Sequence, residues 1–345
     1  MKLKRVGIVG ASGYTGSELT RILAQHPQVE ICAITSESHS GKAFSDLHPF
    51  FRGIVDQKLI TADEISGMEL DLVFLALPHG VSMEYVQKFE HESFRIIDLS
   101  GDYRLNDPET YEQWYGKIHS FTEAFEGAVY GLPELFADQI KNAQLVANPG
   151  CFPTSAILPL APLVSAGLID SKGIIIDSKT AVSGAGIKPK EANLFSNVND
   201  NFKAYGLKKH RHTIEMKQIL DRFSDEGNSL QFTPHLLPVD RGILSTIYVQ
   251  PKSNIELAPL RQLYQNFYGK KPFIRLCENP PAIKDVRASN YCDIFMDYDP
   301  LTNNIILISV IDNLVKGAAG QAVQNMNIMF GFDERQGLSH IPIHP

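Results

Sequence analysis

The sequence has few cysteines, no excess of positive charge and no long uninterrupted apolar run. Its 345 residues include only four cysteines, Cys32, Cys151, Cys277 and Cys292, and none of them forms a CxxC pair. That spacing argues against structural zinc, and a disulfide framework is not expected in a chain of this size. The formal net charge of −7 argues against a nucleic-acid surface, although a local basic pocket for a small anion remains compatible with it.

Membrane and targeting segments are not recognisable either. A membrane span requires roughly 18 consecutive apolar residues, and the longest apolar region, residues 156–169, is interrupted by Pro159 and Pro162. Residues 1–5 lead directly into an apolar strand, without the longer apolar stretch of a secretory signal. We therefore expect a cytoplasmic protein with no metal site and no nucleic-acid or membrane partner.

The chain is long enough for two domains, because single cores rarely grow beyond about 250–300 residues. In residues 1–148, short apolar strands alternate with helical stretches, which favours βαβ units and a parallel sheet. Residues 149–312 contain more strands and fit an α+β domain with a mixed or antiparallel sheet. Predicted strands cover residues 6–9, 29–35, 70–77, 95–99, 173–180, 231–239, 242–250, 293–297 and 304–311; predicted helices cover 17–25, 153–167, 213–223, 258–268 and 313–329.

A glycine-rich segment, GASGYTG, follows the first predicted strand and opens the first predicted helix. Gly10 permits a tight exit from the strand, Gly13 lets the backbone approach a pyrophosphate, and Gly16 lets the helix pack on the sheet. The alternative is a glycine-rich turn without a ligand. We interpret the segment as a dinucleotide-binding loop, with the helix N-terminus facing the phosphates. The expected cofactor contacts in it are Gly10, Ser12, Gly13, Tyr14, Thr15 and Gly16.

The end of the second strand bears on the choice between NAD and NADP. An NAD enzyme usually places Asp or Glu about 20 residues after the loop, where it holds the ribose 2′-hydroxyl. Here Ser36, Ser38 and Lys42 are suited to a 2′-phosphate and favour NADP. Glu37 is a contrary sign, unless its carboxylate points away.

Three further strands end in polar or small-residue loops. In LPHG, Pro78 is expected to line the cofactor site, and His79 is either a polar cap or part of the catalytic apparatus. In SGDYR, Arg104 is suited to clamp a carboxylate or phosphate; the alternative is a surface arginine paired with Asp102. Residues 183–188 either bind an anion or form a flexible turn.

Only one of the four cysteines is predicted to be reactive. Cys151 follows Asn148, Pro149 and Gly150, which form a turn, and helix-forming sequence comes after it. A cysteine at the head of a helix experiences the positive end of the helix dipole, which lowers its pKa and favours the thiolate. Asn148 and nearby N–H groups are suited to hold an oxyanion. The alternative is a buried structural cysteine.

A thiolate nucleophile works with a general acid or base. The candidates are His210 and His212 in KKHRHTIE, where Thr213 is predicted to cap a helix that begins at Ile214. Because alternate residues of an extended chain face opposite ways, we expect only one imidazole to reach Cys151. The sequence does not show which one, and a solvated basic surface is the alternative.

Seven motifs together resemble the N-acetyl-gamma-glutamyl-phosphate reductases (type 1) of arginine biosynthesis, over essentially the whole chain. They are GASGYTG at 10–16, LPHG at 77–80, SGDYRL at 100–105, YGLPEL at 130–135, NPGCFPT at 148–154, HRH at 210–212 and DNLVKGAAGQA at 312–322. The family often has proline where Ile214 stands, and both residues suit the first helical position. The glycine loop and the cysteine turn are also similar to those of aspartate-semialdehyde dehydrogenases.

The resemblance implies an α/β fold with three sequence segments. A Rossmann NADP-binding domain, residues 1–148, is followed by an inserted α+β domain, residues 149–312, of the glyceraldehyde-phosphate-dehydrogenase type. Residues 313–345 then supply a C-terminal helix that completes the Rossmann domain. A homo-oligomer, dimer or tetramer, is expected, with the β-rich domain as the interface.

The resemblance also implies a reaction, the reduction of N-acetyl-L-glutamyl 5-phosphate by NADPH through a Cys151 thioester. The products are N-acetyl-L-glutamate 5-semialdehyde and inorganic phosphate. Asn313 is then expected near the nicotinamide. The residues expected at the substrate are Arg104, Asn148 and Arg211.

Three other functions are compatible with parts of the sequence. An aspartate-semialdehyde dehydrogenase would apply the same chemistry to a shorter substrate, and substrate length cannot be read from these residues. A non-catalytic NADP-binding sensor would need the glycine loop but not Cys151. A cysteine hydrolase would leave the GxxGxxG pattern unexplained.

Overall fold

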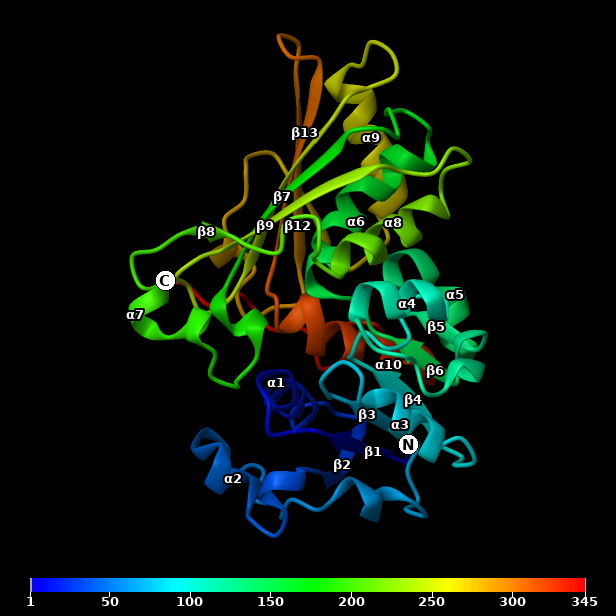
Figure 1. The fold of residues 1–345 in the computed structure, drawn as a ribbon, viewed down its shortest axis with the longest axis vertical. Helices are drawn as coiled ribbons and strands as arrows, with labels where there is room; N and C mark the ends of the chain where they lie inside the picture. Colours follow the sequence, from blue (N-terminus) through cyan, green and yellow to red (C-terminus); the bar gives the residue numbers. More distant parts are fainter. Residues whose placement is uncertain (1, 345) are drawn as a thin grey trace. The chain divides into compact units, whose positions relative to one another are not determined.

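The computed structural model describes residues 2–344, which divide into two compact units (Figure 1). The first unit contains the residues up to Pro149 together with Ala318–Ser339. The second contains Gly150–Gly317 and the residues from His340 on. The chain thus returns to the first unit at Ala318, later than the expected residue 313. Among residues 2–344, every helix is too short or too polar to cross a lipid bilayer.

The first unit is built on a six-stranded sheet in the order β2-β1-β3-β4-β6-β5, with every neighbouring pair parallel. Its strands are β1 (Lys4–Val9), β2 (Val29–Ile34), β3 (Leu72–Leu75), β4 (Arg95–Asp98), β5 (Ala128–Tyr130) and β6 (Leu145–Ala147). All residues of β3 are buried, as expected for a strand covered on both faces. Strands β1 to β4 confirm the predicted parallel sheet. The sequence does not predict β5 and β6, because three residues carry too little periodicity.

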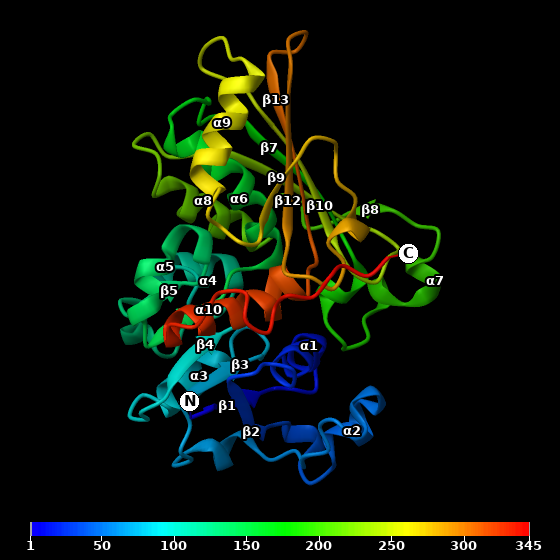
Figure 2. The ribbon, with the colours of Figure 1, turned by 180° about the vertical axis from the view of Figure 1, so that it is seen from behind.

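A helix from the far end of the chain completes this unit. The helices are α1 (Tyr14–Leu23), α2 (Phe44–Leu47), α3 (Ser82–Lys88), α4 (Pro108–Tyr115), α5 (Pro133–Asn142) and α10 (Gly320–Phe330), with 3-10 turns η1 (Glu37–His39), η2 (Pro49–Phe51), η3 (Ala62–Ile65) and η4 (Thr122–Phe125). Helix α10, red in Figure 2, packs against α5 and α1. Asn325 of α10 donates to the Gly131 carbonyl and to Asn148 Oδ1, at 2.9 and 3.0 Å. The predicted Rossmann domain with a C-terminal helix is confirmed.

The second unit is built on a seven-stranded mixed sheet in the order β11-β12-β13-β10-β7-β9-β8. Its strands are β7 (Ile174–Thr180), β8 (Lys203–Ala204), β9 (Leu230–Leu236), β10 (Ile243–Val249), β11 (Ile274–Cys277), β12 (Cys292–Asp299) and β13 (Asn304–Ile311). Its helices are α6 (Cys151–Ser165), α7 (Phe195–Val198), α8 (His212–Asp221) and α9 (Leu257–Tyr268), with 3-10 turns η5 (Val182–Ala185), η6 (Glu191–Asn193) and η7 (Ile283–Asp285) and the π-helical turn η8 (Val315–Ala319). Helices α6, α8 and α9 cover one face of the sheet. The α+β prediction is confirmed, with a mixed sheet.

Helix α6 is buried along most of its length although two prolines, Pro159 and Pro162, lie in its interior. Pro162 has no N–H, so the Leu158 carbonyl lacks its usual helical donor. The Tyr268 hydroxyl of α9 donates to that carbonyl at 2.6 Å, and the Tyr264 hydroxyl donates to the Pro159 carbonyl. Helix α9 therefore replaces the bond that Pro162 removes and adds a second bond at the Pro159 carbonyl, and α6 is continuous from Cys151 to Ser165.

Candidate active site

The glycine loop has the backbone that its motif predicts. Gly10 adopts a φ of +84°, and a Cβ there would lie 2.6 Å from the Ala76 carbonyl oxygen. A Cβ on Gly16 would lie 2.5 Å from Ala11 Cα. A Cβ on Gly13, the residue before α1, would meet no atom within 4 Å. Gly10 and Gly16 thus allow close packing, whereas Gly13 leaves its backbone accessible to a ligand such as a pyrophosphate.

The loop is hydrogen-bonded to the end of β2. Ala11 N–H donates to the Thr35 carbonyl at 3.0 Å, and Gly10 N–H donates to Thr35 Oγ1 at 3.3 Å. Ser36 is buried directly beyond this contact, and Ser38 is exposed. Of the other predicted cofactor contacts, Ser12 and Thr15 are half-buried, while Tyr14 and Pro78 are exposed. Ser12, Tyr14, Thr15, Ser38 and Pro78 are therefore at least partly exposed, whereas Ser36 is not.

Two motifs at the ends of β3 and β4 are joined to each other. Gly101 N–H donates to His79 Nδ1 at 2.6 Å, and Gly80 N–H donates to Asp102 Oδ1 at 2.7 Å. His79 Nδ1 therefore accepts a bond that connects the two loops, as expected if His79 is a polar cap.

Asp98, the last residue of β4, is fully buried next to these loops. Its burial, reinforced by the charge of Asp102, raises its pKa to about 6.

Arg104 is not the surface arginine of the alternative interpretation, because only 6% of it is exposed. Its Nε donates to the Asn148 carbonyl at 2.7 Å and its Nη2 to the Leu99 carbonyl at 2.8 Å. The Asn148 side chain donates to the Ala318 carbonyl at 3.1 Å. The two predicted substrate residues, Arg104 and Asn148, are therefore joined, and they hold the start of the cysteine turn.

Cys151 is the first residue of α6, and Gly150 is its N-cap. Gly150 N–H donates to Oε1 of Glu215, a fully buried residue of α8, at 2.8 Å. A Cβ on Gly317 would lie 2.7 Å from Cys151 Cβ. Burial, with a smaller contribution from the charge of Cys151, raises the pKa of Tyr205. The helix N-terminus at Cys151 stabilises an anion on its sulfur.

Glu215, Tyr205 and Gly317 are not predicted as site residues from the sequence. Only Glu215 has a usable local signal, since it follows His212 by three residues and so lies on the same face of a helix. The tertiary fold brings Gly317 to Cys151 and the Tyr205 ring to the His210 ring.

The predicted backbone around the two histidines is wrong in two respects. Helix α8 begins at His212, so Thr213 lies inside the helix, and its N–H donates to the His210 carbonyl. The segment is not extended, because Arg211 has helical φ and ψ. The two imidazole rings consequently lie with centroids 4.8 Å apart instead of facing opposite ways.

The two histidines differ in their surroundings. The His210 ring contacts the rings of Phe152, Tyr205 and Phe232, with centroids 5.3 to 5.7 Å from its own. Burial, with a smaller contribution from the positive charge of Arg211, lowers the pKa of His210 to about 4. His210 is therefore neutral at pH 7. The His212 ring instead packs on Gly150, the residue directly before Cys151.

The lowered pKa of His210 predicts that the stability of the protein depends on pH. Between pH 6.5 and 4 the unfolded chain binds a proton that the folded imidazole does not, so the free energy of unfolding decreases as the pH falls through this window. We expect His210→Asn to remove on the order of 2 kcal/mol of this decrease. Urea denaturation of both proteins at pH 7 and pH 4.5 measures it. Equal decreases in the two proteins would contradict the assignment; Asp98, whose raised pKa acts in the opposite direction, is common to both.

The packing of His212 on Gly150 predicts the effect of a single methyl group. In Gly150→Ala the new Cβ would lie 2.5 Å from His212 Nε2, although the φ of −68° suits alanine. The imidazole or the turn must move, and we expect kcat to fall about 100-fold with an unchanged Kd for NADP. Gly127→Ala is the control, because its Cβ meets only the Ala124 oxygen, at 4.0 Å. An unchanged kcat in Gly150→Ala would show that this contact has no role in turnover.

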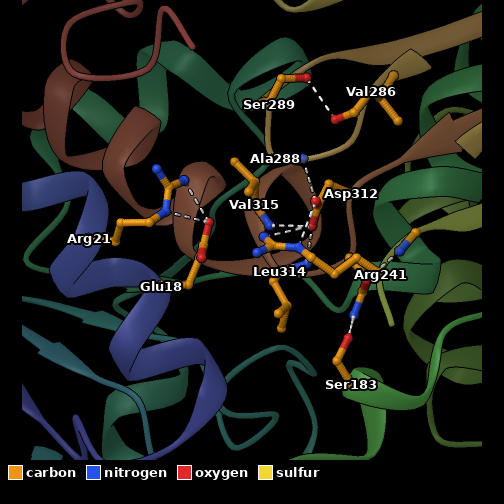
Figure 3. Close-up of polar contacts among 12 residues, drawn as sticks. Glu18, Arg21, Ser183, Arg241, Val286, Ala288, Ser289, Asp312, Leu314 and Val315 are labelled. Atoms are coloured by element: carbon orange, nitrogen blue, oxygen red, sulfur yellow. Dashed lines mark hydrogen bonds and ion pairs between the residues drawn. The ribbon is translucent and has the colours of Figure 1, made fainter. Parts of the chain in front are cut away.

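The DNLVKGA segment anchors the turn that approaches Cys151. Asp312 is fully buried and accepts hydrogen bonds from Arg241 Nε at 2.9 Å and Nη2 at 3.1 Å. It also accepts from the backbone N–H groups of Ala288, Leu314 and Val315 (Figure 3). This network leads directly into η8, which contains Gly317.

Asn313 lies in the second unit, where both ends of its amide are used. Gly242 N–H donates to its Oδ1 at 2.7 Å, and its Nδ2 donates to Ser183 Oγ at 2.9 Å. The loop at residues 183–188 is therefore attached to this segment. The predicted contact between Asn313 and the nicotinamide stays a prediction.

Comparisons with known proteins cover the whole chain. Residues 5–143 match the semialdehyde dehydrogenase NAD binding domain, and residues 151–313 match the semialdehyde dehydrogenase dimerisation domain. The chain is 51% identical to the N-acetyl-gamma-glutamyl-phosphate reductase of Geobacter sulfurreducens (strain ATCC 51573 / DSM 12127 / PCA) and 49% identical to that of Desulfotalea psychrophila (strain LSv54 / DSM 12343). Each match covers 99% of both chains.

Solved structures with a similar fold are aspartate-semialdehyde dehydrogenases. The structure with NADP from Candida albicans has a TM-score of 0.73 at 18% identity, over 95% of this chain and 99% of that chain. The structure of the Vibrio cholerae enzyme II complexed with ASA has a TM-score of 0.71 at 17% identity, over 96% and 99%. At such identities the likeness shows the fold alone.

Proposed function

We propose roles for Cys151 and His212 on the premise that this chain belongs to the N-acetyl-gamma-glutamyl-phosphate reductase family. It is an NADP-dependent oxidoreductase of arginine biosynthesis. It reduces N-acetyl-L-glutamyl 5-phosphate to N-acetyl-L-glutamate 5-semialdehyde and inorganic phosphate. One observation supports both roles: Cys151 and His212 are both next to Gly150. Gly150 directly precedes Cys151, and the His212 ring packs on it.

Cys151 is the proposed nucleophile. Its thiolate attacks the acyl carbon, a carbon–sulfur bond forms, and the carbon–oxygen bond to phosphate breaks, so that phosphate leaves with one proton from solvent. NADPH, when bound, supplies the hydride that reduces the resulting thioester. The carbon–sulfur bond then breaks, which releases the aldehyde and regenerates the thiolate. The N-terminus of α6 stabilises the sulfur anion at the beginning and end of this cycle.

His212 is the proposed acid and base. In each tetrahedral intermediate the substrate oxygen carries negative charge, and a positioned imidazole donates a hydrogen bond or a proton to it. The same imidazole accepts the proton when the carbonyl re-forms. Glu215 supports this geometry indirectly, because it bonds the Gly150 N–H on which the ring packs.

The glycine loop fits a nucleotide, since the open side of Gly13 leaves its backbone free to approach a pyrophosphate. We propose that the loop residues hold the pyrophosphate, that Ser36 and Ser38 hold the 2′-phosphate, and that Pro78 lines the site. Arg104 bonds the Asn148 backbone, and we propose that these two residues together position the turn before Cys151 for the substrate. Arg211, next to both histidines, would supply positive charge for the phosphate group.

A homo-oligomer is part of the proposal. The second unit matches a dimerisation domain. In its sheet Ile175 of β7 and Tyr248 of β10 form a cross-strand pair and are 44% and 38% exposed. Burial of these apolar side chains against a second copy would favour association. Analytical ultracentrifugation of the purified chain measures the oligomeric state.

The assay that tests the function runs in the reverse direction. With N-acetylglutamate semialdehyde and NADP⁺, we expect NADPH formation that requires inorganic phosphate, because phosphate must attack the thioester carbonyl and displace the Cys151 thiolate. Aspartate semialdehyde at the same concentration distinguishes the shorter-substrate alternative. Equal turnover of the two aldehydes, or turnover without phosphate, would contradict the proposed reaction.

A further inference from the structure

The acidic residue beyond β2 conflicts with a 2′-phosphate. Rossmann domains that use NAD usually place a carboxylate just past this strand, where it accepts a hydrogen bond from the ribose 2′-hydroxyl. The same carboxylate repels a phosphate at that position. Glu37 occupies this region, between Ser36 and Ser38, and the conflict needs a physical solution if the cofactor is NADP.

The structure shows where the Glu37 carboxylate is held. Its Oε1 accepts a hydrogen bond from the Ala62 N–H at 2.9 Å. Ala62 is the first residue of η3, and the capping box of that turn bonds Thr61 with Glu64. The capping box leaves the Ala62 N–H available, and Glu37 bonds it.

Backbone bonds hold the two segments in place for this contact. Ile60 N–H donates to the Ile34 carbonyl at 3.1 Å, and Ser36 N–H donates to the Ile60 carbonyl at 3.0 Å. Gly41 N–H donates to the Leu59 carbonyl at 2.8 Å. The loop that contains Glu37 is therefore attached on both sides to the segment that leads into Ala62.

We propose that the Ala62 N–H is a determinant of cofactor specificity. By binding the Glu37 carboxylate it keeps that charge away from the ribose, so that Ser36 and Ser38 can receive a 2′-phosphate. A released carboxylate would repel NADP and offer NAD an acceptor for its 2′-hydroxyl. This inference rests on the proposed use of NADP(H) by the glycine loop.

Ala62→Pro is the most direct test, because proline has no N–H and removes the donor. Proline is compatible with the first position of a turn, and Thr61 has the extended backbone (ψ 158°) that proline requires of the preceding residue. We expect the ratio of kcat/KM for NADPH to that for NADH to fall at least about tenfold, or about 1.4 kcal/mol. Ala62→Gly, which keeps the N–H, is the matched control and should keep the wild-type ratio.

Glu37 variants give an independent route that does not depend on the folding of Ala62→Pro. Glu37→Asp keeps the charge but shortens the side chain, so it should lose the Ala62 bond and lower the NADPH preference. Glu37→Gln keeps an acceptor without charge and should match wild type. Combining Ala62→Pro with Glu37→Gln should restore the preference, because no carboxylate remains to repel the phosphate.

Binding provides a second readout besides turnover. The Kd values of NADP⁺ and NAD⁺, measured by calorimetry, should change in the same ratio as kcat/KM. A wild-type protein that binds neither nucleotide would overturn both the proposed function and this inference. A wild-type preference for NADPH that persists in Ala62→Pro and Glu37→Asp would overturn the inference alone, as would a tenfold gain in preference in Glu37→Gln.

Discussion

Replacement of Cys151 by serine is expected to lower kcat for the reductase reaction by at least about a thousandfold, equivalent to about 4 kcal/mol. A serine hydroxyl is not ionised at neutral pH, and the N-terminus of α6 cannot compensate for the loss of a thiolate. The covalent intermediate that divides the reaction into two steps would then not form. Steady-state kinetics at saturating substrate measure the effect.

Two controls separate loss of chemistry from loss of structure. The Kd of NADP⁺ should be unchanged in Cys151→Ser, because the glycine loop does not involve this residue. Cys277→Ser should keep full activity, since burial raises the pKa of the Cys277 thiol to about 11 and keeps it protonated. Substantial turnover by Cys151→Ser, or inactivation by Cys277→Ser, would contradict the thioester mechanism.

The second large effect concerns stability. Asp312→Ala is expected to lower the free energy of unfolding by about 3–5 kcal/mol. The variant leaves the Arg241 guanidinium without its buried partner and deprives three backbone N–H groups of their acceptor. Because Asp312 leads into η8 and Gly317, which packs on Cys151, kcat should fall as well. Urea denaturation measures the stability.

An exposed ion pair in the same unit provides the comparison. Glu226 is 69% exposed and lies 3.7 Å from Lys252 Nζ. We expect Glu226→Ala to change the free energy of unfolding by less than about 1 kcal/mol, since solvent screens such pairs. A similar small loss in Asp312→Ala would mean that the buried network is not a major source of stability.

The histidine segment shows where periodicity alone fails. The sequence identifies His210 and His212, but the prediction of an extended chain places their rings on opposite sides. The helix actually begins at His212, and the rings lie together. The sequence contains no signal for the aromatic pocket around His210, because Phe152 and Phe232 come from distant positions in the chain.

Glu37 illustrates the same limit for cofactor preference. From the sequence its carboxylate is a sign against NADP, and the prediction depends on where the carboxylate points. The contact that decides it comes from Ala62, which the fold brings close through a backbone pairing between residues 34–41 and 59–62. No pattern within either segment predicts that pairing.

The sequence by itself determined the features that depend on local geometry. The glycine loop needs small residues at fixed positions between a strand and a helix, and the cysteine turn needs Pro and Gly before a helix, so both are readable from a few adjacent residues. Only the tertiary structure decided which groups support them. It places Glu215 and the His212 ring at Gly150, and the Ala62 N–H at Glu37, because such contacts depend on how distant segments pack and not on the spacing within any one of them.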